Sequence, residues 1–354
     1  MKILSRYISK TILSSTLMVL FVLLGLYTFM DFIAELNDLG KGNYQLMDIA
    51  TYIFLTMPKR LYELLPVAAL LGTVLGLGSL ASQSELVAMR AAGISIQQIN
   101  RAVMMAALLL MFIAVILGEV IRPFSEQKAE ELQSVAQTGT TGSHSDHGFW
   151  TRDGLHFNHI EHILPDSRFL GISIYEFDQQ HHLLSVIKAE QAEYIDEHWL
   201  LTDVVKSDID QQGVRVKSEK HAEWKSKLNP GLLNIVIVPP AFLPVWELVD
   251  YIDYLKSNNQ AVDHYEIALW TKIMMPFSSA VMVFLAVPFV FGPLRSAPIG
   301  GRIVTGALVG IGFHLFNKSF QHMGLVFSLE PWLSATIPIL LFASLAWFMM
   351  RRTR

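Results

Sequence analysis

Long apolar runs dominate the chain before residue 121 and after residue 263. A helix needs about 20 consecutive apolar residues to cross a hydrocarbon core about 30 Å thick. Five uncharged runs meet or approach that length. A sixth, 303–317, is shorter, but Arg302 and Lys318 flank it and their long side chains can reach the membrane interfaces. The pattern predicts six transmembrane helices, with both termini on one side. The five longer runs are 11–30, 64–84, 102–118, 273–294 and 331–350.

The segment between the third and fourth runs alternates apolar and polar residues, which is typical of β-strands with one buried face. The strand candidates are FLGISIYEFD, LLSVIKAEQAEYI, HWLLTDVVKSDI and VRVKSEKHAEW. Several short strands at this spacing favour a sandwich or β-jelly-roll. EQKAEELQSVAQ before them and PVWELVDYIDYLKSN after them are expected to be helical connectors. The expected fold class is a membrane α-helical bundle with an inserted β-jelly-roll domain, divided as 1–121, 122–262 and 263–354.

Composition agrees with a membrane location. Only 16% of the 354 residues are charged and 52% are hydrophobic, whereas soluble chains carry about 25% charged residues. The chain has no cysteine, which excludes disulfides and thiolate metal sites. Residues 122–262 hold more acidic than basic side chains, and the rest of the chain holds more basic ones.

The basic residues predict the orientation. Cytoplasmic loops of membrane proteins carry an excess of Lys and Arg, and one set of connections here holds ten of them against a single acid, Glu85. Both termini and the stretch around Glu85 are therefore expected in the cytoplasm, with the inserted domain on the opposite side. The ten are Lys2, Arg6, Lys10, Arg90, Arg101, Arg295, Arg302, Arg351, Arg352 and Arg354.

SELVAMRAAGIS, residues 84–95, is a short amphipathic stretch between two of the apolar runs. It is too short to span a membrane, and Ser84 is expected to cap its N-terminus beside Glu85. Such a helix can dock on a protein, with Leu86, Val87 and Met89 filling an apolar groove. It can also lie on lipid headgroups, although such helices usually carry many Lys and Arg. The residues alone leave both interpretations open.

No nucleotide-binding motif is present in the sequence: the chain lacks G-x-x-x-x-G-K-[ST], and GLGSLA at 76–81 does not match the dinucleotide fingerprint. Gly72 and Gly76 are four residues apart, as are Gly306 and Gly310. Small residues at this spacing let a neighbouring transmembrane helix approach closely, and we expect that role for both pairs.

No catalytic, cofactor or metal site is expected in this chain. His156, His159 and His162 are spaced by three, so on a strand they would alternate between faces and could not converge on a metal. Glu119, at the end of the third run, is expected at the outer interface, paired with Arg122.

Two motifs resemble a known family: LGLGSLASQSELVAMRAAGIS at 75–95 and FGPLRSAPIGGRIVTG at 291–306. They are similar to the LptF/LptG family of lipopolysaccharide export permeases, and the likeness extends over essentially the whole chain. It implies a Gram-negative inner-membrane subunit of an ABC-type exporter, with a periplasmic β-jelly-roll domain. Such a subunit extracts lipopolysaccharide and passes it to a periplasmic bridge toward the outer membrane.

The resemblance also implies partners. These are an LptF-like paralogous permease subunit, an LptB-like ATPase dimer that binds the ATP, an LptC-like single-span protein and an LptA-like periplasmic bridge. Residues 84–94 would form the coupling helix that docks on the ATPase, with Glu85 as the ionic contact. The residues assigned to this helix are Ser84, Glu85, Leu86, Val87, Met89, Arg90, Ala91 and Gly93.

Two further groups of residues are expected to meet the lipid. Cations near the outer membrane surface are candidates for its phosphates: Lys41, Arg122, Lys128 and Lys318. By family analogy, apolar residues of the first and fifth spans are candidates for the cavity wall and gate: Phe21, Leu24, Phe29, Val304, Leu308 and Ile311. The outer end of the first span departs from the family, where it is lysine-rich; here MDFIAELNDLGKGN is acidic.

Two other functions stay open. A mechanotransmission-type permease subunit would share the coupling helix and the extracytoplasmic domain but would carry no lipid itself. A membrane-bound hydrolase or glycosyl-transfer enzyme would need a nucleophile and base or a constellation of acids, and none is evident in the sequence.

Overall fold

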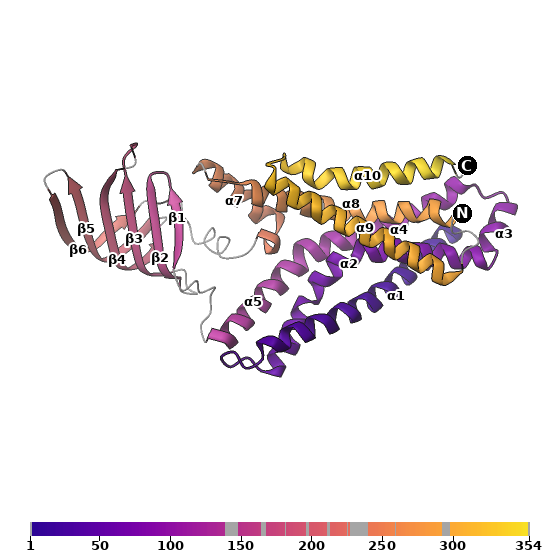
Figure 1. Cartoon of the computed structure of the whole chain (residues 1–354), viewed down its shortest axis with the longest axis horizontal. Coiled ribbons are helices and arrows are strands. Elements are labelled where there is room, and N and C mark those ends of the chain that lie inside the picture. The colour runs from indigo at the N-terminus through magenta and orange to yellow at the C-terminus, as the bar shows by residue number, and fades with distance from the viewer. Residues whose placement is uncertain are drawn as a thin grey trace.

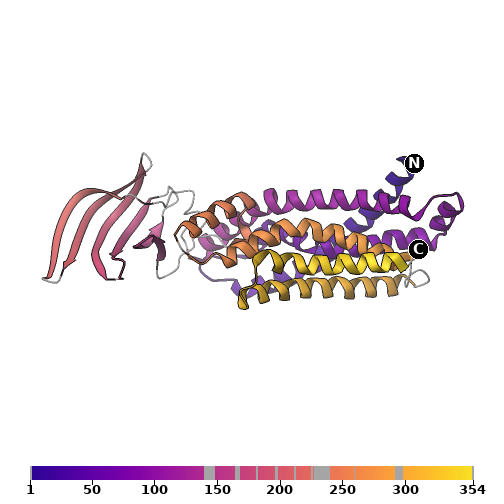
Figure 2. The ribbon, with the colours of Figure 1, turned by 90° about the horizontal axis from the view of Figure 1, so that it is seen from above.

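The computed structural model describes residues 2–138, 148–163, 168–180, 182–195, 198–210, 213–224, 226, 240–258, 260–291 and 298–352. Its helices form an elongated bundle, and its strands form a sheet beyond one end of that bundle (Figure 1). Both termini lie at the other end, as both views show (Figure 2). This confirms the expected fold class of a membrane helical bundle with an inserted β-domain.

Within the described residues, six helices are long and apolar enough to cross a membrane, as predicted. Most extend beyond the uncharged runs because charged and amphipathic turns continue them at the bundle ends. The six are α1 (Lys2–Glu35), α2 (Leu46–Ser82), α4 (Ile96–Ile116), α8 (Asp263–Phe291), α9 (Ile299–Val326) and α10 (Pro331–Arg352).

Shorter helices connect these six. The sequence predicted α5 (Arg122–Thr138) and α7 (Val245–Ser257) as connectors, and both are helical. A five-residue π-helix, η2 (Leu117–Ile121), joins α4 to α5, so that one long helix runs out of the bundle toward the sheet. The remaining short elements are η1 (Leu36–Asp38), α3 (Glu85–Ala91) and η3 (Pro240–Phe242).

α2 lies at the centre of the bundle. In its most apolar stretch 78% of the residues are buried, against 6% in α1. The glycine pairs explain the close packing on α2. A Cβ on Gly72 would overlap the Thr16 backbone of α1, and Cβ atoms on Gly306 and Gly310 of α9 would meet Leu71 and Val67 of α2. The predicted close helix approaches are confirmed.

The sheet is an antiparallel meander whose strands follow chain order. The sequence predicted β3 to β6; β1 and β2 were not predicted, because their polar, histidine-rich residues hide the alternation. The sequence predicted a β-jelly-roll, and the described strands of this domain form a single antiparallel sheet. The strands are β1 (Phe149–Asp153), β2 (His156–Ile163), β3 (Phe169–Phe177), β4 (Leu183–Ile195), β5 (His198–Asp210) and β6 (Gly213–Trp224).

One face of the sheet carries an apolar core, to which α7 contributes beside the edge strand β1. Trp199 is fully buried and stacks on Phe169 at 4.2 Å between ring centroids. Tyr251 and Leu255 of α7 lie in the same cluster. Because α7 buries its apolar side against the strands, sheet and α7 form one packed unit.

Candidate functional site

The candidate coupling segment forms α3, at the end of the bundle away from the sheet (Figure 1). Its C-terminus is closed by Gly93, whose φ of +85° suits glycine. Gly93 N–H donates to the Arg90 carbonyl, and Ile94 N–H donates to the Met89 carbonyl. These two bonds form a Schellman motif, so α3 is a short helix with a defined stop.

The N-terminus of α3 differs from the prediction. Ser84 stands at the N-cap position, but with φ of 62° its side chain makes no capping hydrogen bond. Ser84 is in the left-handed region, because the chain must turn sharply from α2 into α3 within two residues. The expected side-chain cap was therefore wrong, although the helix begins where predicted.

α3 has one side against the bundle and one side exposed. Leu86 is buried in the main core cluster and Met89 packs against it. Both therefore anchor α3 to its own chain, and Val87 is left as the outward-facing apolar side chain. Ser84, Arg90, Ala91 and Gly93 are exposed as well.

Glu85 has a contact that the sequence did not indicate. The hydroxyl of Tyr7 on α1 donates to its carboxylate, with distances of 2.9 Å to Oε2 and 3.2 Å to Oε1. This hydrogen bond links α3 directly to α1, the helix expected to line a gate. Two exposed polar residues far apart in sequence give no signal by which the pair could have been found.

Arg302 brings the two family-like motifs together. It is 3% exposed and donates from Nη1 to the carbonyl of Gly78. A Cβ on Gly78 would lie 2.6 Å from this nitrogen, so glycine leaves room for the buried guanidinium. Gly78 lies in the first motif and Arg302 in the second. The part of the second motif at 292–297 lies outside the described residues.

The headgroup candidates have different surroundings. Lys41 is exposed and pairs with Asp38, Lys128 is exposed with its Nζ over the Phe124 ring, and Lys318 is exposed on α9.

Arg122 is 7% exposed, so it differs from the other three candidates. Its Nε donates to Glu126 at 2.7 Å, and its guanidinium lies over the Tyr62 ring. Two neighbouring cations are also paired, Lys59 with Glu126 at 3.0 Å and Arg60 with Asp31 at 2.7 Å. A phosphate at Arg122 would have to displace Glu126.

The gate candidates form two exposed apolar strips, one on α1 and one on α9, and both helices pack on α2. In a membrane these strips face lipid or another subunit. Phe21, Phe29, Val304, Leu308 and Ile311 are exposed, and Leu24 is half-buried.

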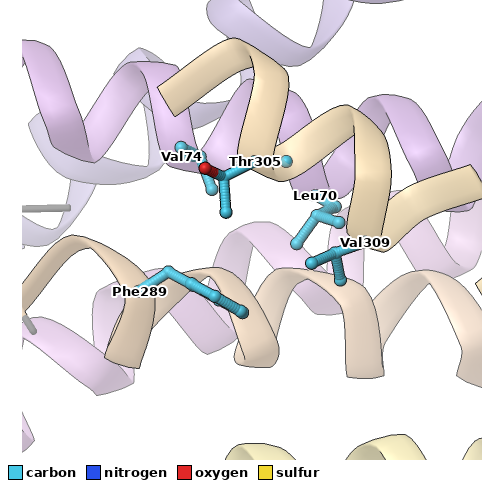
Figure 3. Close-up of a pocket in the computed structure, with 6 residues that line it drawn as sticks. Leu70, Val74, Phe289, Thr305 and Val309 are labelled. Atoms are coloured by element: carbon cyan, nitrogen blue, oxygen red, sulfur yellow. The ribbon is translucent and has the colours of Figure 1, made fainter. Parts of the chain in front are cut away.

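A narrow apolar crevice lies between α2, α8 and α9 (Figure 3). It does not admit a water molecule, so it is a gap in helix packing that cannot hold an acyl chain. The lining residues are Leu70, Val74, Phe289, Thr305, Gly306 and Val309.

Glu119 does not pair with Arg122 as expected. Its Oε1 lies 3.8 Å from Nζ of Lys272 on α8, and its Oε2 accepts from the backbone N–H of Val245 at 2.7 Å. The π-turn at η2 places Glu119 beside α7 and α8, and Arg122 pairs instead with Glu126, four residues further along its own helix. In the part of the chain that the structure describes, no group of three or more His, Asp or Glu could hold a metal ion.

Comparison with known proteins gives a consistent result. The family model described as "Lipopolysaccharide export system permease LptF/LptG" matches residues 6–352. The lipopolysaccharide export system permease protein LptG of Escherichia coli (strain K12) is 36% identical over 355 residues, and that of Haemophilus influenzae is 36% identical over 353 residues. Each alignment covers 99% of both chains. With six apolar helices, these matches point to a multi-pass protein of the inner membrane. The chain belongs to the LptF/LptG family of lipopolysaccharide export system permeases.

Proposed function

We propose that this chain is the permease subunit of an ATP-driven exporter that extracts lipopolysaccharide from the inner membrane and passes it to a periplasmic bridge. An ATPase dimer docks on α3 and supplies the hydrolysis, a second permease subunit completes the cavity, and a single-span protein stands beside them. The termini and α3 are cytoplasmic, and the sheet is periplasmic.

The observation that carries this proposal is α3. A short helix with a defined stop, anchored by Leu86 and exposing Val87 and Arg90, suits insertion into a protein groove. Glu85 reaches α1 through Tyr7. A force on α3 would therefore reach a helix that carries an exposed apolar strip.

The sheet supports the lipid part of the proposal. Each CH₂ moved from bilayer to water costs about 0.8 kcal/mol, so a multi-chain lipid needs replacement apolar surface. The apolar face of the sheet offers such surface, with the half-buried Ile187 at its margin.

The first test replaces Glu85 with Ala. We expect less ATPase to co-purify and ATP-dependent lipopolysaccharide release from proteoliposomes to fall several-fold. Gln97→Ala is the matched control, because Gln97 is exposed on the same end of the bundle. Normal ATPase recovery and normal release in Glu85→Ala would refute docking through this carboxylate.

A second test separates a lipid carrier from a mechanotransmission subunit. A photo-crosslinking residue at Ile187 should label with lipopolysaccharide during turnover, whereas one at Glu190, exposed on the opposite face of β4, should not. Absence of labelling at Ile187, with coupled ATP hydrolysis intact, would favour the mechanotransmission alternative.

A further inference from the structure

Three segments far apart in the chain meet where the bundle joins the sheet: the π-helix η2, the η3–α7 link and α8. At their meeting point Lys272 of α8 is 5% exposed. A buried ammonium is costly unless its protons are hydrogen-bonded and its charge is paired. The partners of this lysine therefore show which segments its charge holds together at the junction.

Lys272 binds both neighbouring segments. Its Nζ donates to the Leu243 carbonyl, just before α7, and lies 3.5 Å from the Gly118 carbonyl in η2. The Glu119 carboxylate, also in η2, lies 3.8 Å away. One ammonium thus bridges α8, the link into α7 and the helix that leaves the bundle through η2.

Glu119 completes the bridge from the other side. Its second oxygen accepts from Val245 N–H, the first residue of the 13-residue α7. The N-terminus of a helix favours a negative charge, and Pro244 at the N-cap offers no side-chain cap there. The carboxylate of another helix therefore caps α7 and pairs with α8.

The π-helix gives this carboxylate its position. π-turns are rare and often mark functional sites. Within η2, a Cβ on Gly118 would lie 2.5 Å from the Tyr62 ring of α2. Glycine therefore lets the widened turn lie against α2, with Glu119 beside α7 and α8.

The two sides of α7 are held differently. Its contact with the sheet is mainly apolar, through buried residues such as Leu248 and Tyr254, and carries no ion pair among the described residues; the Tyr254 hydroxyl adds a hydrogen bond to the Arg152 carbonyl of β1 at 3.3 Å. Its contact with η2 is this charged, hydrogen-bonded joint. Near the sheet, α8 is tied to α7 by Lys256 and Glu266 at 2.6 Å, and Tyr265 lies edge-on to Tyr251. Sheet, α7 and the start of α8 thus form one unit that meets the α4–η2–α5 helix at Glu119.

We infer that Glu119 and Lys272 are positioning residues that fix the sheet unit on the bundle, so that lipid leaving the bundle meets the apolar face of the sheet. The role in lipid transfer rests on the proposed function. The fixing of the sheet does not, and it is measured separately.

The experiment uses the absence of native cysteine. Spin labels on Gln127→Cys in α5 and Glu190→Cys in β4, both exposed positions, report the distance distribution between bundle and sheet in the full complex without ATP. We expect one narrow distribution in the parent chain. Glu119→Ala and Lys272→Met should broaden or shift it, and Glu119→Asp, which keeps the charge, should largely restore it. Glu130→Gln, an exposed acid on α5, is the matched control.

The single variants leave one buried charge unpaired and can fail to fold. The double variant Glu119→Gln/Lys272→Met removes both charges and keeps the side-chain volumes, so it should purify normally. In it we also expect a broadened distribution, a several-fold loss of lipopolysaccharide release, and unchanged co-purification of the ATPase at the other end of the bundle.

An unchanged distance distribution in the double variant would overturn the inference, and so would a broadened one with normal release. Loss of ATPase binding in Glu85→Ala tests the proposed function independently, because α3 lies far from this joint (Figure 2).

Discussion

The packing of α1 against α2 gives a prediction whose magnitude follows from geometry. In Gly72→Ala the new Cβ would lie 2.3 Å from the Thr16 Cα and 2.5 Å from its backbone nitrogen. Carbon atoms pack best at about 3.5–4.0 Å, so the two helices must separate by about 1 Å. Because the obstacle is backbone, no rotamer change relieves it. Overpacking of this kind costs about 1–3 kcal/mol.

Gly25→Ala is the matched control. It lies on α1 with nothing within 4 Å of its added Cβ, and it gains the same helix propensity of about 1 kcal/mol. The propensity gain cancels in the comparison, so Gly72→Ala should be less stable than Gly25→Ala by about 1–3 kcal/mol. Thermal unfolding of the purified complex in mild detergent measures the difference. Equal midpoints would refute the claim that Gly72 sets the α1–α2 distance.

Three further predictions concern the sheet and the outer end of the bundle. Trp199→Ala should destabilise the sheet unit by about 3–5 kcal/mol, because the indole is fully buried; limited proteolysis should then cut the sheet while the bundle stays intact, and an uncut sheet would contradict this. Asp31→Asn should lower the free energy of unfolding by about 1–2 kcal/mol, because the amide is uncharged and offers Arg60 one acceptor oxygen in place of the two that now accept at 2.7 Å. An unchanged thermal midpoint would mean that solvent fully screens this ion pair. The hydrogen bond from the His182 backbone N–H, together with the weaker effect of the Gln180 N–H, holds the pKa of Asp178 below the usual value of an aspartate. Stabilisation from this carboxylate is therefore present above about pH 4 and lost as pH falls through the lower folded pKa. The thermal midpoint of the parent chain should fall on acidification by an increment that Asp178→Asn lacks, and identical pH profiles would contradict it.

The sequence predicted elements whose pattern is imposed by their surroundings. Lipid excludes charge, so uncharged runs marked the six helices, and one-sided burial marked β3 to β6. The close approaches at Gly72 and Gly306 followed from their spacing. Contacts between distant polar residues were not predictable: Glu119 was assigned to Arg122, three residues further along the chain, and its partner Lys272 comes from another span. The contact between Tyr7 and Glu85 was not predictable either, because no sequence pattern near one residue indicates the other as its partner.

The length and central position of α2 have a mechanical consequence. At 1.5 Å per residue its 37 residues form a rod about 55 Å long. A rotation of about 1° around the α3 end would therefore move the opposite end by about 1 Å, roughly the displacement that separates packed from unpacked side chains. Pro58 lies in the half away from α3 and Pro66 lies near the middle of the helix, and the lost backbone hydrogen bonds make bending easiest there. α2 is thus a lever that is stiff near α3 and compliant near the sheet.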